Sequence, residues 1–445
     1  MKWPTVVFSV TALLIASSDS AIGQVAKTEI TKWQYGKNGA VSLTYDDGSI
    51  NQFRVAVPIM DSFGFPATFF IITGNIPASR YRGTFVGRPT NTIIQETASV
   101  FTNKDNFFER ASAIGYLGYE GTLDYHTRAG ELYDEGKQVD RAYRVLDEAY
   151  EKVRKGSFPP TKAREDRLKN RNSITWDELR SLASRGYEFA SHTVTHPRLA
   201  VLDDANLVYE LEKSRQEILD ELGFKHTFSV ECPYGTEDER AVHAALLRYP
   251  LARNLMPDQD VDDLDRFSNT NPTSSHKEYV RWQRGPLTET PMQLMETWVD
   301  QAAAQGNIWL VLVFHGVDGV GWKPKTSAEL RDYFRYIHSK EENVWVATFQ
   351  DVGKYIRERL HSTVASYRDS EAISVTLRSD LTDLSYDLAL TLKTAVPKEW
   401  NAVEVRQGER TQHVNVLRTN DRDYVVYQAV PNAERVTLSQ AAPTE

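Results

Sequence analysis

The sequence predicts an α/β fold, a barrel or a doubly wound sheet, that is followed by a small β-sandwich. Between about residues 39 and 360, short apolar runs alternate with amphipathic stretches of helical period. This alternation is typical of a parallel sheet covered by helices. From residue 365 onward the pattern changes to near-period-two alternation, interrupted by Asp, Asn, Pro and Gly turns. That second pattern is typical of a small antiparallel β-sandwich.

Six apolar runs are the candidate strands of the α/β part. Their apolarity is continuous rather than alternating, which indicates strands that are buried on both faces. The runs cover residues 41–44, 67–73, 187–190, 228–230, 308–314 and 344–348.

The stretches between these runs carry recognisable helix ends. Thr175 and Glu178 have the spacing of a capping box, and Asp203 is placed to cap a helix that ends before Gly223. Residues 349–360 are predicted to form a helix with one buried face, which completes the α/β part.

We expect four segments along the chain. Residues 1–24 are expected to be a signal peptide, residues 25–362 the α/β domain, and residues 365–445 the β-sandwich. Residues from about 76 to 172 carry no clean strand–helix repeat, so we interpret them as an insertion that lies over or beside the α/β domain.

The N-terminal segment has the features of a secretory signal peptide. Lys2 precedes an apolar run over residues 6–16, and Ala16 and Ser18 occupy the minus-three and minus-one places of a cleavage site. The run is short for a membrane span. We therefore expect a secreted or periplasmic protein with no membrane span after removal of this segment.

Composition argues against a nucleic-acid-binding protein and against a disulfide-stabilised protein. The formal net charge of -9 is spread along the chain, and no basic patch is present, so nucleic acid is not an expected partner. The one cysteine, Cys232, allows no internal disulfide. It has no assigned histidine base, so we interpret it as a buried free thiol rather than a nucleophile.

Four short motifs follow predicted strands. They are "TYDDG" with Asp46 and Asp47, "SHTVTHPRL" with His192 and His196, "ECPYG" with Tyr234, and "WLVLVFHG" with His315. Catalytic groups of α/β barrels collect at the carboxyl ends of the strands. Two imidazoles and a carboxylate can hold zinc or another divalent ion. Taken alone, the histidine pair would favour two surface histidines in a turn over a metal site, but the other motifs favour a site.

Together these motifs resemble the NodB-homology polysaccharide deacetylases, which form carbohydrate esterase family four. The resemblance covers roughly residues 39–360 without the insertion, with the motifs in the family's order. It implies a distorted (β/α) barrel and the metal-dependent removal of acetyl groups from a polysaccharide or oligosaccharide.

The resemblance also implies a role for each motif residue. The ligands of the divalent metal, with zinc as the expected ion, would be Asp47, His192 and His196. Asp46 would be the general base that deprotonates a metal-activated water. In the adjoining motifs, the backbone N–H of Tyr234 would stabilise the oxyanion and His315 would be the general acid. For the sugar, we expect Tyr234 to line the cleft. Trp322, just after His315, fits a stacking surface for a sugar ring and simple packing equally well.

The sequence departs from the family in two places. Many members have an arginine that pairs with the base aspartate, whereas Glu231 occupies that position here. A glutamate that points inward would raise the pKa of Asp46 by like-charge repulsion. The Asp–Trp motif of the family is not legible, and Arg281 in "YVRWQRG" is the candidate positive partner of Asp46.

The leading hypothesis is an exported, metal-dependent carbohydrate deacetylase that hydrolyses linear amides. An O-acetyl esterase would use the same residues. The alternative is a catalytically weak carbohydrate-binding protein on a deacetylase fold, with the lost arginine as a mark of decay. The histidines outside the motifs, among them His126, are interpreted as structural or surface residues.

Overall fold

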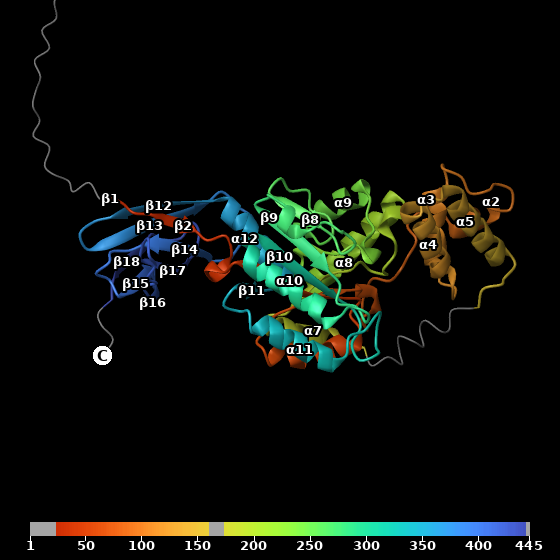
Figure 1. Ribbon diagram of the computed structural model, residues 1–445. Helices are drawn as coiled ribbons and strands as arrows, with labels where there is room; N and C mark the ends of the chain where they lie inside the picture. The colour runs from red at the N-terminus through yellow and green to blue at the C-terminus, as the bar shows by residue number, and fades with distance from the viewer. Residues whose placement is uncertain (1–23, 160–172, 442–445) are drawn as a thin grey trace, which may run out of the picture. The chain divides into compact units, whose positions relative to one another are not determined.

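The computed structural model describes residues 24–159 and 173–441 (Figure 1). The expected signal peptide therefore lies outside the described residues, except for Gln24. The chain forms two compact units. One unit joins the residues up to Thr31 with Ser362–Asp380 and Ala389–Glu445, and the other contains Lys32–His361 and Leu381–Leu388.

The larger unit is built on a curled, wholly parallel sheet, which confirms the expected distorted barrel. The strand order is β7-β6-β5-β4-β3-β10-β9-β8, and β11 pairs with β3. The strands are β3 (Gly39–Asp46), β4 (Thr68–Ile71), β5 (Glu188–Ser191), β6 (Ser229–Val230), β7 (Leu251–Ala252), β8 (Val261–Leu264), β9 (Tyr279–Arg284), β10 (Ile308–Phe314) and β11 (Val344–Val346). Both β3 and β10 are buried over their whole length, as continuous apolarity predicts.

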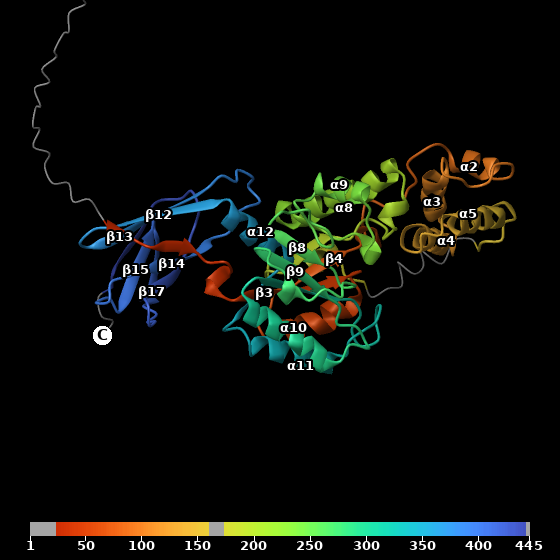
Figure 2. The same cartoon turned by 45° about the horizontal axis from the view of Figure 1, so that its top comes forward.

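Helices lie on both sides of this sheet (Figure 2). They are α1 (Val57–Asp61), α7 (Trp176–Ala183), α8 (Asp204–Leu222), α9 (Glu239–Leu246), α10 (Met292–Gln305), α11 (Ser327–His338) and α12 (Phe349–Leu360). The capping box of Thr175 and Glu178 begins α7, and the Asp203 carboxylate accepts from two N–H groups at the start of α8. The predicted helix ends are therefore confirmed.

A helical insertion separates β4 from β5 in the sequence. It contains α2 (Thr90–Glu96), α3 (Phe107–Tyr116), α4 (Thr122–Gly130) and α5 (Val139–Arg154). These helices share an apolar core of their own, which also takes in Val201 from the segment after β5. The insertion is therefore packed against the segment that follows the two motif histidines.

Three strands of the barrel sheet escaped the sequence analysis, namely β7, β8 and β9. β7 has only two residues, whereas polar residues interrupt β8 and β9. Arg281 and Gln283 of β9 are almost fully buried. Arg281 Nη1 donates to Ala252 O at 2.6 Å, and Gln283 Nε2 donates to Arg253 O at 3.0 Å. These side chains connect β9 to the carboxyl end of β7. The two strands lie near opposite ends of the strand order.

The smaller unit is a two-sheet β-structure. Its first sheet has the order β1-β12-β13-β18-β15-β16 and its second the order β17-β14-β2. The strands are β1 (Gln24–Val25), β2 (Thr28–Ile30), β12 (Ser362–Arg368), β13 (Ala372–Ser379), β14 (Leu390–Ala395), β15 (Ala402–Gln407), β16 (Arg410–Asn415), β17 (Tyr424–Ala429) and β18 (Val436–Gln440). Buried and partly exposed residues alternate along β13 and β17, as expected for a sandwich.

The unit boundaries differ from the expected ones at both ends of the barrel. β2 pairs with β14, so the barrel unit begins at Lys32 rather than at residue 25. Leu381–Leu388 belongs to the barrel, because Glu358 accepts a hydrogen bond from Leu388 N and Lys354 pairs with Asp387. Neither the pairing of β2 with β14 nor the contacts of Leu381–Leu388 can be predicted from local periodicity in the sequence.

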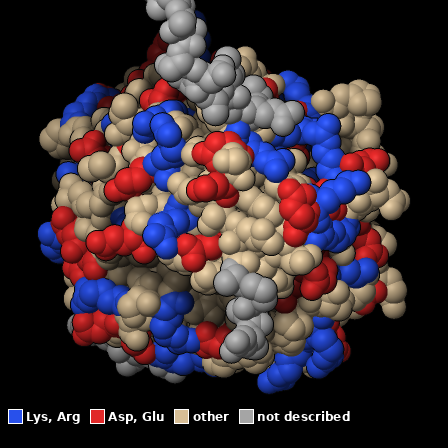
Figure 3. Space-filling model, turned by 90° about the vertical axis from the view of Figure 1, so that its left-hand side faces the viewer, with Lys and Arg blue, Asp and Glu red and all other residues tan. Residues whose placement is uncertain are grey.

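Charge on the described surface is mixed. Figure 3 shows one face of the molecule, on which basic and acidic side chains are interspersed rather than gathered by sign. Among the described helices, none combines the length and the apolar character that a bilayer span requires.

Candidate active site

The motif residues converge because their strands are parallel neighbours. Asp46 ends β3 and Asp47 follows it, His192 follows β5, and His315 follows β10. Tyr234 lies in a short helical turn, η7 (Pro233–Gly235), after β6. The carboxyl ends of parallel strands meet at one edge of the sheet, so all these side chains reach the same place.

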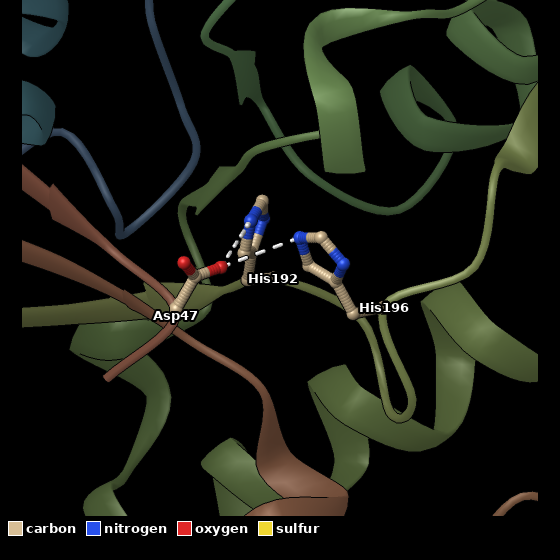
Figure 4. A group of neighbouring side chains, drawn as sticks. All are labelled: Asp47, His192 and His196. Carbon is tan, nitrogen blue, oxygen red and sulfur yellow. Dashed lines mark ion pairs between the residues drawn. The ribbon is translucent and has the colours of Figure 1, made fainter. Parts of the chain in front are cut away.

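Asp47, His192 and His196 form a cluster with the composition of a metal site (Figure 4). Asp47 Oδ1 lies 3.3 Å from His196 Nε2 and 3.8 Å from His192 Nε2. The three candidate donor atoms lie within 4.8 Å of one another. Figure 4 shows both imidazoles turned toward the carboxylate.

The residues around this cluster fit a divalent cation. His192 Nδ1 lies 3.0 Å from Glu231 O, so its N–H donates to that carbonyl and the lone pair of Nε2 faces Asp47. Burial lowers the pKa of His196 well below its ordinary value and raises that of Asp47. A neutral imidazole is the form that binds metal, and a half-buried carboxylate is stabilised by a cation.

The backbone at the cluster is in an uncommon conformation. Asp47, Thr193 and His196 all have positive φ, at 73°, 66° and 63°. Such strain gathers at functional sites when surrounding bonds hold it in place. Gly48 follows Asp47 and has φ 70°, a left-handed conformation that favours glycine. This conformation, rather than the end of strand β3, accounts for the glycine.

Glu210 of α8 holds the histidine loop. Its Oε2 accepts from Val194 N at 2.8 Å and Thr195 N at 2.9 Å, and its Oε1 accepts from Thr195 Oγ1 at 2.6 Å. Glu210 is fully buried, so these bonds replace its hydration. It fixes the turn from which His196 projects.

Asp46 is paired with Arg253, and the expected pairing with Arg281 is wrong. Arg253 Nη1 donates to Asp46 Oδ1 at 2.7 Å and Nη2 to Oδ2 at 2.6 Å, a bidentate pair in which neither side chain is exposed. Arg281 Nε instead donates to Asp263 Oδ1 at 2.7 Å. The guanidinium that pairs with Asp46 therefore comes from the residue after β7.

Glu231 supports this pair instead of opposing it. Its Oε1 lies 2.9 Å from Arg253 Nη2 and accepts from Asn254 Nδ2 at 2.8 Å. Burial alone would raise the pKa of Asp46, but the charge of Arg253 and its hydrogen bonds to the carboxylate outweigh burial and hold the pKa below its usual value. The expected rise through Glu231 is therefore wrong, because Arg253 bonds both carboxylates.

His315 lies on the other side of Asp46. Its Nε2 is 3.4 Å from Asp46 Oδ2, and its Nδ1 is buried with no hydrogen-bond partner among the described residues. Burial lowers the pKa of His315 to about 4. Gln52 Nε2 donates to both Asp46 O and His315 O, at 2.5 and 2.7 Å, and so ties the two strand ends together.

Two aromatic residues border the site. The Trp322 indole meets the His315 ring edge-on, with centroids 4.6 Å apart, and is 51% exposed. The Tyr234 ring lies 4.7 Å from that of His196, with the Arg198 guanidinium 4.4 Å from the centroid of the Tyr234 ring.

The free cysteine, Cys232, lies two residues before Tyr234. Burial raises the pKa of its thiol well above the ordinary value, which disfavours a thiolate.

Sequence reasoning missed Arg253, Glu210, Gln52 and the role of His126. His126 of α4 is fully buried, and its Nδ1 lies 2.8 Å from Ala111 O. Its Nε2 accepts from Arg198 N at 3.1 Å, two residues after His196. His126 thus joins the insertion to the histidine loop. None of the four residues stands in a motif that would have marked it.

We expect His126 to make the protein sensitive to acid. Burial lowers its pKa to about 4, below the ordinary 6.5, so the unfolded chain binds a proton in this window that the folded protein does not. Stability from this residue is therefore complete above pH 6.5 and falls between pH 6.5 and 4. At pH 4.5 the loss is about 2 kcal/mol relative to pH 7.

Urea unfolding at pH 7 and pH 4.5 measures this effect. His126→Gln keeps a donor and an acceptor without titrating. Its loss of stability between pH 7 and pH 4.5 should therefore be about 2 kcal/mol smaller than that of the wild type. The exposed His243, changed to Gln, is the matched control. Equal acid losses in the wild type and His126→Gln would contradict the assignment.

The comparisons with known proteins agree with this geometry. A family model described as polysaccharide deacetylase matches residues 34–100 and 131–249. The matched segments contain Asp46, Asp47, His192, His196 and Tyr234. Over these two segments, this chain is similar to the polysaccharide deacetylase family. His315 lies beyond the matched segments, and its contact with Asp46 places it in the same site.

The individual relatives are distant in sequence from this protein. A gellan lyase of a Bacillus species is 26% identical over 277 residues, which cover 59% of this chain and 11% of the lyase. The chain therefore matches only a small part of that protein's length.

Three solved structures are also similar. A putative polysaccharide deacetylase from Mycobacterium smegmatis is 16% identical, with a TM-score of 0.38 over 75% of this chain and 95% of that chain. The Xyl-CE4 domain of a xylanase from the hindgut metagenome of Trinervitermes trinervoides is 13% identical, with a TM-score of 0.33 over 71% and 89%. The family 4 carbohydrate esterase of Streptomyces lividans, in complex with acetate, is 13% identical, with a TM-score of 0.32 over 69% and 91%.

Proposed function

We propose that this protein is an exported, metal-dependent hydrolase that removes acetyl groups from a polysaccharide or oligosaccharide. The observation that carries the proposal is the convergence of Asp46, His315 and the Asp47–His192–His196 cluster at one edge of the sheet. The family supplies the substrate class, and the signal-like N-terminal segment supports export.

A divalent cation fits the three-residue cluster, and zinc suits two imidazoles and one carboxylate. When bound, such an ion lowers the pKa of a coordinated water and polarises a carbonyl group. Asp47, His192 and His196 would hold it, with the orientation of His192 fixed by Glu231 O.

Asp46 and His315 move the protons of the reaction. Arg253 keeps Asp46 ionised, so its carboxylate can accept a proton from the attacking water. His315 is uncharged at neutral pH because of its lowered pKa. Since Nε2 lies 3.4 Å from Asp46 Oδ2, one proton can pass across this pair to the leaving nitrogen or oxygen atom.

The binding-protein alternative is less well supported. A protein that only binds sugars has no need of a buried, charge-compensated acid–base pair beside a metal cluster, because such a pair is costly to desolvate. The retention of Asp46, Arg253 and His315 in one network therefore favours turnover.

Acetate release by the purified protein tests the proposal. N-acetylated chitooligosaccharides and O-acetylated xylan are offered in parallel, with and without a chelator, and zinc is then added back. We expect release from one of the two substrates, lost with the chelator and restored by zinc. Asp47→Asn should bind less zinc and release no acetate.

The outcomes separate the alternatives. Release from chitooligosaccharides identifies an amidase, and release from xylan identifies an esterase. Chelator-insensitive release that persists in Asp47→Asn would contradict the metal-dependent mechanism. Zinc binding at the cluster with no release from either substrate would favour the binding-protein alternative.

A further inference from the structure

A pocket of ≈ 450 Å³ lies beside the deacetylase site and is not used by the reaction described above. The residues that line it come mainly from the segment after β8 and from β9 and α10. Those used below are Arg266, Phe267, Asn269, Trp282, Arg284 and Thr290. We call it the arginine pocket.

The arginine pocket carries positive charge, and the carboxylates whose charges act on its two arginines, namely those of Asp47, Glu237 and Asp265, form no ion pair with them. None of its described lining residues is acidic, and neither Arg266 nor Arg284 forms an ion pair with a carboxylate of the described residues. Asp265, whose charge acts on Arg284, instead accepts from Phe267 N at 2.8 Å. In a chain of net charge -9, two such guanidinium groups in one pocket favour an anionic ligand.

Two hydrogen-bond donors of the pocket residues lack partners. Arg266 Nη2 donates to Tyr234 O at 3.2 Å, but Nη1 has no partner among the described residues. The indole Nε1 of Trp282 is also without one. Buried donors in native proteins normally find acceptors, and both of these groups can only donate. A carboxylate, which only accepts, complements them.

The pocket also has surfaces suited to a sugar ring. Phe267 is 70% exposed and lies beside Arg266, with the guanidinium 5.0 Å from its ring centroid. Trp282 is almost fully buried and the Arg284 guanidinium covers its ring at 4.5 Å, so Phe267 is the aromatic surface that is open to a sugar. Asn269 and Thr290 add amide and hydroxyl groups that can meet sugar hydroxyls.

Arg266 connects the pocket to the reacting groups. Besides its bond to Tyr234 O, its charge acts on both Asp47 and His315. Gly235 makes this approach possible, because a Cβ at that position would lie 2.8 Å from Arg266 Nη2. A ligand held in the arginine pocket is therefore next to the site of acyl removal.

We propose that the arginine pocket binds an acidic sugar residue, a uronate, of the polysaccharide whose acetyl groups the neighbouring site removes. This inference rests on the proposed function for its choice of a carbohydrate. It adds to that function a preference for acidic chains among the acetylated polysaccharides and oligosaccharides.

Calorimetric titration with two tetrasaccharides tests the pocket without requiring turnover. The probes are tetragalacturonate and the same tetrasaccharide after its carboxyl groups have been reduced to alcohols. We expect the wild type to bind the acidic form about tenfold more tightly than the neutral form, and less so as salt is raised. Arg266→Gln should remove this preference.

Two further variants keep the test decisive. Phe267→Ala alters an exposed ring, so it should fold normally and weaken binding of both tetrasaccharides several-fold. Arg335→Gln, an exposed arginine of α11, is the matched control and should bind like the wild type. Equal affinity of the wild type for both probes, or wild-type binding by both Arg266→Gln and Phe267→Ala, would overturn the proposal.

The two proposals fail separately. Preferential binding of tetragalacturonate with no acetate release from any substrate would support the pocket and contradict the hydrolase. Chelator-sensitive acetate release with no preference for the acidic probe would support the hydrolase and contradict the pocket.

Discussion

Replacing Arg253 with methionine is expected to lower the free energy of unfolding by about 3–5 kcal/mol, the typical cost of removing one partner of a buried ion pair. Arg253 bonds both Asp46 and Glu231, and none of the three side chains is more than 3% exposed. Without the guanidinium, two buried carboxylates face each other with no cation. One of them must take up a proton, so the pKa of Asp46 rises and the base loses its ionised form near neutral pH.

Urea unfolding and acetate release on the same samples measure both consequences. The double variant Arg253→Met with Glu231→Gln removes one of the two stranded charges, so it should recover part of the lost stability. Arg253→Lys keeps the charge without the bidentate geometry and should lose less stability than Arg253→Met. A loss below about 1 kcal/mol in Arg253→Met, within the range of an exposed pair, would show that the network contributes little.

The His315→Gln variant is expected to lower the turnover number on an N-acetyl sugar by about 10²- to 10⁴-fold, the usual contribution of a general acid or base. An amine leaves poorly unless it is protonated, and His315 is the group that would protonate it under the proposed function. On p-nitrophenyl acetate the loss should be much smaller, because nitrophenolate leaves without a proton.

Zinc content is the control for this variant. His315 is not one of the three candidate ligands, so His315→Gln should bind as much zinc as the wild type. Equal losses on the two substrates would contradict the role of general acid. They would indicate instead that the contact of His315 with Asp46 only positions the base.

The sequence predicted the location of the site better than its electrostatics. Asp46, His192 and His315 each follow an apolar run, and a parallel sheet brings such strand ends together whatever the details of the strands. Arg253 follows a strand of two residues, which is too short for any periodicity. The chemical roles of these residues remain predictions that the variants above test.

The error over Arg281 has a physical origin. A buried arginine in a strand has to satisfy its donors locally, and Arg281 does so on Asp263 and Ala252 O. Its neighbour Gln283 does the same on Arg253 O. The position of Arg281 in the sequence, near the place of the family's Asp–Trp motif, gives no information on its partners, because they lie on β7 and β8.

Strand β2 has a consequence for how the protein is made. Its partner β14 is synthesised hundreds of residues later, as the pairing of Ile30 with Leu392 requires. During translation, the barrel can therefore fold while β2 is still an unpaired edge, and such edges promote aggregation. A recombinant barrel is better started at Lys32 than at residue 25. A fragment that keeps β2 but lacks β14 would expose β2 without its hydrogen-bonding partner.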